Sequence, residues 1–230
     1  MNHFLDSNVI IGYISCLDDL FDNSKEVISY NEDNFYSENV KQEVNQVFGR
    51  KSDEYSKFIM KLTKKLNQFD NITLISSNEF HSYINSLNNI GHLGVSEMHI
   101  TFDKMWNIFD FGENQEVMLV KFKFDEFLNE LDAFNLSRKK DIFNRLILVP
   151  NHTKKDRKIM EKIKENNLRE ELLHFADEEI LFDANEFCKY NPELKLKFVT
   201  ADQNLIKVIN ILMEYLCLDE CINLKEFSNS

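Results

Sequence analysis

An apolar strand that runs directly into a carboxylate, with a helix straight after it, occurs near both ends of this chain. The run 3–14 predicts a short strand, then Asp6, then a helix, and the run 196–206 repeats this order around Asp202. In open α/β sheets, ligands bind beyond the carboxyl ends of the strands. Asp6 taken alone is equally well explained as a cap of the following helix. The repeat is what favours a functional site.

Two further acids are predicted on helices between these strands. Glu43 follows the strand-like residues Phe35 and Tyr36, on a helix whose valines face inward, so its side chain can border a cleft. A solvated helix position is the ordinary alternative. Asp177 is expected in the first turn of a helix with an apolar stripe over 180–184, where the helix dipole favours a carboxylate.

The middle of the chain has a different pattern from its two ends. Residues 52–143 read as helices, and aromatic residues such as Phe102 and Trp106 recur at the spacing of a packed helix face. Core packing is therefore favoured over base stacking. The histidines in this stretch do not pair at the i, i+4 spacing of a helical metal site beside an acid, and we interpret them as structural.

These patterns predict an α/β chain with an insertion. The 230 residues, 43% of them hydrophobic, leave one or two domains open. The apolar run 146–149 predicts a third core strand of the buried parallel type. We expect a core formed by 1–51 and 144–230, interrupted by a mainly helical segment, 52–143. If 72–75 were the third strand instead, the insertion would move downstream.

Charge is distributed unevenly along the chain. The net charge is −12, yet 138–164 carries a local balance of +7 and 50–65 one of +4. Salt confines the field of exposed charges to roughly 8–10 Å, so an acidic protein can still hold a phosphate backbone locally. Ordinary solvated helix faces are the alternative interpretation of both runs.

The four acids, taken in order with their local sequences, resemble those of the PIN-domain nucleases. The matching positions are Asp6 after the first strand, Glu43 on the helix after Phe35-Tyr36-Ser37, Asp177 in D-x-x-I-L-x-x-A, and Asp202 in F-V-T-A-D-Q-N-L. The resemblance covers roughly 1–50 and 144–230. It implies a PIN-like three-layer α/β/α fold with a central parallel sheet, from which the long helical insertion departs.

The resemblance implies a metal-dependent ribonuclease. Four carboxylates brought together repel one another unless divalent cations lie between them, and hard oxygen ligands suit Mg²⁺ or Mn²⁺. Asn8, Thr200 and Asn204 are expected to support these ligands or contact substrate, and Glu178 is an alternative ligand beside Asp177. The expected contacts to the RNA backbone are Lys154, Lys155, Arg157 and Lys158.

Two other functions remain open from the sequence. A haloacid-dehalogenase-like phosphatase also has an acid after its first strand, but its second Asp would stand where this chain has Asn8. A catalytically inactive PIN-like scaffold or interaction protein is the stronger competitor.

Location and partners follow less directly. No apolar run reaches the roughly eighteen residues that span a bilayer, and we expect a soluble, cytoplasmic protein with no membrane partner. A homodimer is compatible with the sequence but follows from no feature in it. PIN-like toxins act with an antitoxin, so the resemblance leaves a protein regulator open.

Overall fold

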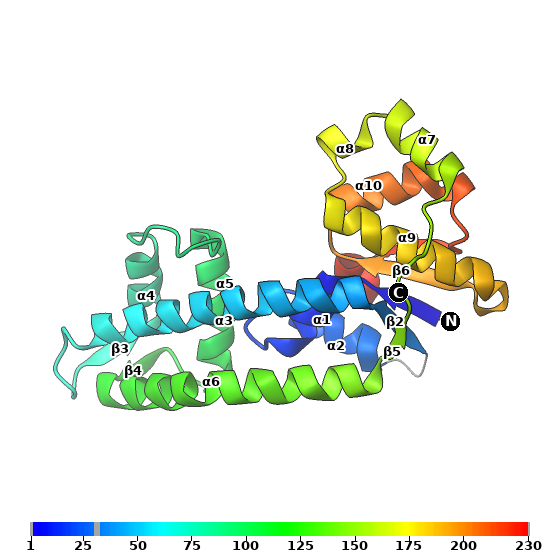
Figure 1. Ribbon diagram of the computed structural model, residues 1–230. Helices are drawn as coiled ribbons and strands as arrows, with labels where there is room; N and C mark the ends of the chain where they lie inside the picture. Colours follow the sequence, from blue (N-terminus) through cyan, green and yellow to red (C-terminus); the bar gives the residue numbers. More distant parts are fainter. Residues whose placement is uncertain (1, 30–32, 230) are drawn as a thin grey trace. The chain divides into compact units, whose positions relative to one another are not determined.

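The computed structural model describes residues 2–29 and 33–229, which belong to two compact units (Figure 1). Unit 1 comprises Met1–Ile14, Leu20–Gln46 and Lys140–Ser230, and unit 2 comprises Ser15–Asp19 and Val47–Lys139. The boundaries at 46/47 and 139/140 fall within two long helices, α3 (Glu38–Leu66) and α6 (Val117–Arg145). The limits predicted from the sequence, at 51/52 and 143/144, lie within the same two helices. The assignment of Ser15–Asp19 to unit 2 had no signal in the sequence.

Unit 1 contains a five-stranded, entirely parallel sheet in the order β5-β2-β1-β6-β7. Its strands are β1 (Asn2–Leu5), β2 (Asn34–Ser37), β5 (Ile147–Val149), β6 (Leu196–Thr200) and β7 (Glu220–Asn223). The strand order changes direction between β1 and β6, and such a reversal is where open α/β sheets bind ligands. The chain is therefore α/β, with its topological switch point at the carboxyl ends of β1 and β6.

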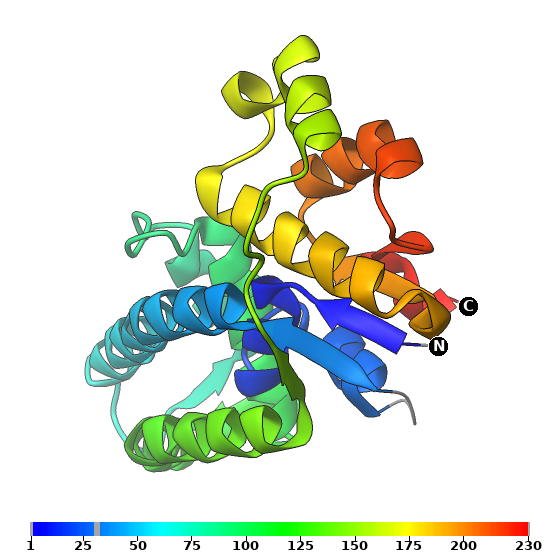
Figure 2. The ribbon, with the colours of Figure 1, turned by 45° about the vertical axis from the view of Figure 1, so that its right-hand side comes forward.

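Helices lie on both faces of this sheet (Figures 1 and 2). Right-handed crossovers place α1 and α2 on one face and α9 and α10 on the other. The elements of unit 1 outside the sheet, besides the ends of α3 and α6, are α1 (Ser7–Ile14), α2 (Phe21–Ser29), α7 (Arg157–Glu165), α8 (Leu168–Glu171), α9 (Phe175–Tyr190), η1 (Pro192–Leu194), α10 (Gln203–Leu212), η2 (Met213–Tyr215) and η3 (Leu224–Asn229).

The centre of the sheet is apolar, as the sequence predicted for strands β1 and β6. Phe4 pairs with Phe198 in register, and their buried rings stack with centroids 5.8 Å apart. Such burial supplies most of the stability of a parallel sheet, which is covered on both faces. The packing fixes how far β1 and β6 extend, and hence where the acids that follow them emerge.

The third core strand lies at 147–149, as predicted, and pairs with β2. It is nevertheless an edge strand, with Ile147 and Leu148 exposed by 42% and 48%. The prediction of a fully buried strand was therefore wrong, because an apolar run of this length looks the same at the edge and in the centre of a sheet. The alternative strand at 72–75 is excluded, since β3 (Leu74–Ser76) pairs with β4 (Asn114–Glu116) in a separate antiparallel sheet.

Unit 2 is helical apart from that two-stranded sheet. It contains most of α3 and α6 together with α4 (Ser77–Ile84) and α5 (Val95–Ile108). The ring of Phe80 packs against Phe102, Trp106 and Phe124, with centroids 5.0–5.9 Å apart. The predicted aromatic core is thus confirmed for these side chains, although Phe122 is exposed. In the described part of the chain, no helix has the length and apolar character needed to cross a bilayer.

Candidate active site formed by four carboxylates

Asp6 immediately follows β1, and its side chain is almost fully buried, with 2% exposed. Its Oδ1 accepts a hydrogen bond from the backbone N–H of Ser7 at 2.7 Å. Its Oδ2 accepts from Asn8 Nδ2 and from the Thr200 hydroxyl, each at 2.6 Å. Three donors thus fix the orientation of this carboxylate.

Asn8 and Thr200 join the ends of β1 and β6 through a hydrogen-bond network. The second N–H of Asn8 donates to Thr200 Oγ1 at 3.0 Å, and Asn8 Oδ1 accepts from the backbone of Ala201 at 3.0 Å. Thr200 Oγ1 donates its single proton to Asp6 and also accepts from the backbone N–H of Asp202. Both amide protons of Asn8 and the one hydroxyl proton of Thr200 are therefore used. The two side chains position Asp6.

Asp202 follows β6 and caps α10. Its Oδ1 accepts from the backbone N–H groups of Asn204 and Leu205, at 2.7 and 3.0 Å. The capping role considered for Asp6 thus belongs to Asp202. Asn204 contributes its backbone to this cap, while its side chain is exposed.

Glu43 and Asp177 come from helices α3 and α9. The Ser7 hydroxyl donates a hydrogen bond to the Glu43 carboxylate, a contact that the sequence did not indicate. The other oxygen, Glu43 Oε2, is buried and has no hydrogen-bond partner among the described residues. Asp177 lies in the first turn of α9, as predicted. An unpaired buried carboxylate oxygen is costly, and this one requires either a proton or a cation.

The pKa values show that the four acids are within electrostatic reach of one another. Burial, opposed by the Thr200 hydrogen bond and assisted by the charges of Glu43 and Asp177, raises the pKa of Asp6 to about 7. Burial, Glu43 and Asp202 raise the pKa of Asp177 to about 6. Burial and Asp202 also raise the pKa of Glu43. Repulsion of this kind is what a bound cation relieves.

The side chains of the four acids offer the type of ligand atom that a divalent metal ion prefers. It offers carboxylate oxygens only, one of them buried and unpaired, and hard cations such as Mg²⁺ and Mn²⁺ prefer oxygen ligands. Within residues 2–29 and 33–229, no three His, Cys, Asp or Glu side chains lie in a group that could hold a metal ion. The four acids thus interact through their charges, but their side chains are not arranged as ligands of one ion.

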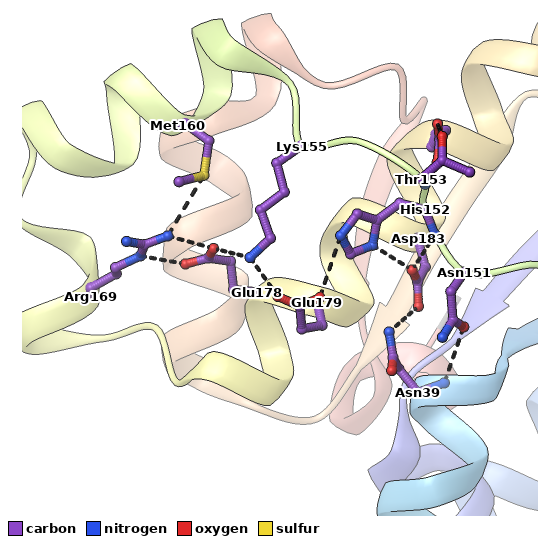
Figure 3. Close-up of polar contacts among 11 residues, drawn as sticks. Asn39, Asn151, His152, Thr153, Lys155, Met160, Arg169, Glu178, Glu179 and Asp183 are labelled. Atoms are coloured by element: carbon purple, nitrogen blue, oxygen red, sulfur yellow. Dashed lines mark hydrogen bonds and ion pairs between the residues drawn. The ribbon is translucent and has the colours of Figure 1, made fainter.

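Glu178 and Lys155 form ion pairs within the protein and are therefore not available for the roles predicted from the sequence. Glu178 is buried, with 1% of its side chain exposed, and it accepts from Lys155 Nζ and from Arg169 Nε and Nη2, each at 2.6 Å (Figure 3). These two cations neutralise the Glu178 carboxylate, so it is not a free ligand for a metal ion. Lys155 also pairs with Glu179. Both side chains are therefore committed within the protein.

The other predicted RNA contacts remain at the surface. Lys154, Arg157 and Lys158 are exposed, and Arg157 pairs with Glu161 at 2.9 Å. No ion pair between described residues includes Lys154 or Lys158. These two lysines are thus the predicted contacts that are free to bind a phosphate.

Asp183, which the sequence did not single out, braces the site. It is fully buried; Oδ1 accepts from the backbone N–H and the Nδ1–H of His152, each at 2.7 Å, and Oδ2 accepts from Asn39 Nδ2 at 2.9 Å (Figure 3). Asn39 lies one turn before Glu43 on α3, and Asp183 lies on the helix of Asp177. The brace therefore fixes α3 against α9. The sequence signal for this contact was the i, i+4 spacing of Asn39 and Glu43, which places both side chains on the same face of α3.

Replacing Asp183 by Ala should lower the free energy of unfolding by about 3 kcal/mol, because three buried donors lose their acceptor. Urea denaturation would measure the change. As a control, Glu161→Ala removes an exposed acid and should change the free energy by less than about 0.5 kcal/mol. Equal stability of the two variants would show that Asp183 does not brace the unit.

Comparison of the chain with models of known protein families, with characterised proteins and with solved structures gives no match.

Proposed function

We propose that this chain is a metal-dependent ribonuclease with a PIN-like three-layer α/β/α fold. The observation that carries the proposal is a set of acids from different elements at and near the switch point of the sheet, where burial and the charges of neighbouring acids raise the pKa values of Asp6, Glu43 and Asp177. Perturbed acids gathered at the expected ligand position of an α/β sheet favour a catalytic role over a purely structural one.

Asp6, Glu43, Asp177 and Asp202 would hold the metal. When bound, Mg²⁺ or Mn²⁺ would activate water for attack on a phosphodiester and neutralise charge that develops on the phosphate. Asn8 and Thr200 keep both oxygens of Asp6 in fixed positions, and Ser7 orients Glu43. Asn8 also argues against the phosphatase alternative, because an amide cannot supply the proton that a second Asp would supply there.

Cleavage of labelled single-stranded and duplex RNA by the purified chain tests the proposal. We expect cleavage with Mn²⁺ or Mg²⁺ and none with a chelator. Cleavage that persists in chelator would overturn the metal-dependent mechanism. Intact RNA under every condition would favour the inactive scaffold, and hydrolysis of small phosphoesters alone would favour the phosphatase.

The structure changes which basic residues should bind RNA. Lys154→Ala with Lys158→Ala should weaken binding to single-stranded RNA and reduce the slope of log affinity against log salt by about 1.4, or about 0.7 for each lost phosphate contact. Titration in chelator measures binding without cleavage. The control is Lys25→Ala with Lys225→Ala, which removes two exposed charges from α2 and η3. If both pairs have the same effect, the contribution is only that of net charge.

A further inference from the structure

Two histidines of unit 2 face each other across neighbouring helices. His81 on α4 and His99 on α5 place their Nδ1 atoms 2.7 Å apart, with the rings stacked at a centroid distance of 4.9 Å. Both side chains are partly exposed. The sequence offered no signal for this pair, since eighteen residues separate the two positions.

The outer nitrogen of each ring has its own acceptor. His81 Nε2 lies 3.0 Å from Asp103 Oδ1, and His99 Nε2 lies 2.9 Å from Asn85 Oδ1. A carboxylate oxygen only accepts hydrogen bonds, so His81 Nε2 carries the ring proton, and with Asn85 Oδ1 as the acceptor His99 Nε2 carries it too. A neutral imidazole has one N–H, so both Nδ1 atoms present lone pairs. Two lone pairs at this distance repel each other unless a cation lies between them.

We infer that His81 and His99 bind a transition-metal ion of the imidazole-preferring type, such as Zn²⁺ or Ni²⁺, through their Nδ1 atoms. Metal-binding histidines typically donate the other ring N–H to a carboxylate or carbonyl oxygen, which is the role of Asp103 and Asn85 here. Zinc–nitrogen bonds of about 2.0–2.1 Å at a tetrahedral angle separate the two nitrogens by about 3.3 Å. Because both side chains are partly exposed, their Nδ1 atoms can move apart from 2.7 Å to this distance.

The site is open to solvent. Among the described residues no third His, Cys, Asp or Glu completes it, so water would fill the remaining positions. Its nitrogen ligands distinguish it from the four carboxylates of unit 1, which suit Mg²⁺ or Mn²⁺. Binding at the two sites can therefore be measured separately.

Calorimetric titration of the full chain with Ni²⁺ at neutral pH tests the inference. We expect the wild type to bind one Ni²⁺ more than His81→Gln or His99→Gln does, and binding at this site to be weakened at least about tenfold in Asp103→Asn. His92→Gln is the matched control, an exposed histidine of the same unit, and should bind as the wild type does. Asp6→Asn should also retain the ion, which separates this site from the carboxylates.

Circular dichroism establishes whether each variant folds. If one histidine variant does not fold, the other and the half-exposed Asp103→Asn decide the outcome. Wild-type affinity in the folded His81, His99 or Asp103 variants would overturn the inference. An absence of Ni²⁺ binding to the wild type would also overturn it, and the two Nδ1 atoms would then be bridged by a proton.

Discussion

Asp6→Asn should lower the rate of RNA cleavage at least about 100-fold. The substitution keeps the size of the side chain but removes the charge that would hold the cation, and its single oxygen can accept from only one side of the Ser7, Asn8 and Thr200 donor set. Single-turnover cleavage in saturating Mn²⁺ measures the effect on the chemical step. Asp219→Asn is the control, because it removes one exposed charge from the same unit. Equal cleavage by wild type and Asp6→Asn would exclude the proposed mechanism.

Without divalent cations, Asp6→Asn should also stabilise the protein at alkaline pH. The pKa of Asp6 rises from 3.8 in the unfolded chain to about 7 in the folded one. Below pH 4 both states hold the proton. Between pH 4 and 7 the unfolded state releases it first, so the wild type loses stability as pH rises, on the order of 4 kcal/mol. Asn does not titrate and avoids this loss.

The free energy of unfolding of both proteins, measured with urea in chelator at pH 5 and pH 8, tests this expectation. The advantage of Asp6→Asn over the wild type should increase with pH. Adding Mn²⁺ at pH 8 should then stabilise the wild type more than the variant, because an ion that binds only the folded state shifts the equilibrium by mass action. A difference between the two proteins that is independent of pH would show that Asp6 keeps an ordinary pKa.

Local sequence patterns predicted the parts of the fold that depend on neighbouring residues. A strand, an acid and a helix in succession gave the positions of β1 with Asp6 and of β6 with Asp202, because alternation and capping act over a few residues. The same reasoning identified the helices that carry Glu43 and Asp177 and the third strand at 147–149.

Features that depend on distant partners could not be predicted in this way. Lys155 looked like a free cation, yet Glu178 on α9 neutralises it. The edge position of β5 depends on the strand order, which no short run encodes. The pairing of His81 with His99 depends on how α4 packs against α5. In each case the deciding contact is tertiary.

The pairing of β1 with β6 has a consequence for biosynthesis. Thr200 lies 194 residues after Asp6, so the hydrogen bond that orients the acid joins two residues that are made far apart in time. At about 5–20 residues per second, a ribosome adds the second partner roughly 10–40 seconds after the first. A nascent chain therefore lacks the assembled carboxylate cluster until Asp202 has been made. Contacts of such long range also favour slow folding of the sheet.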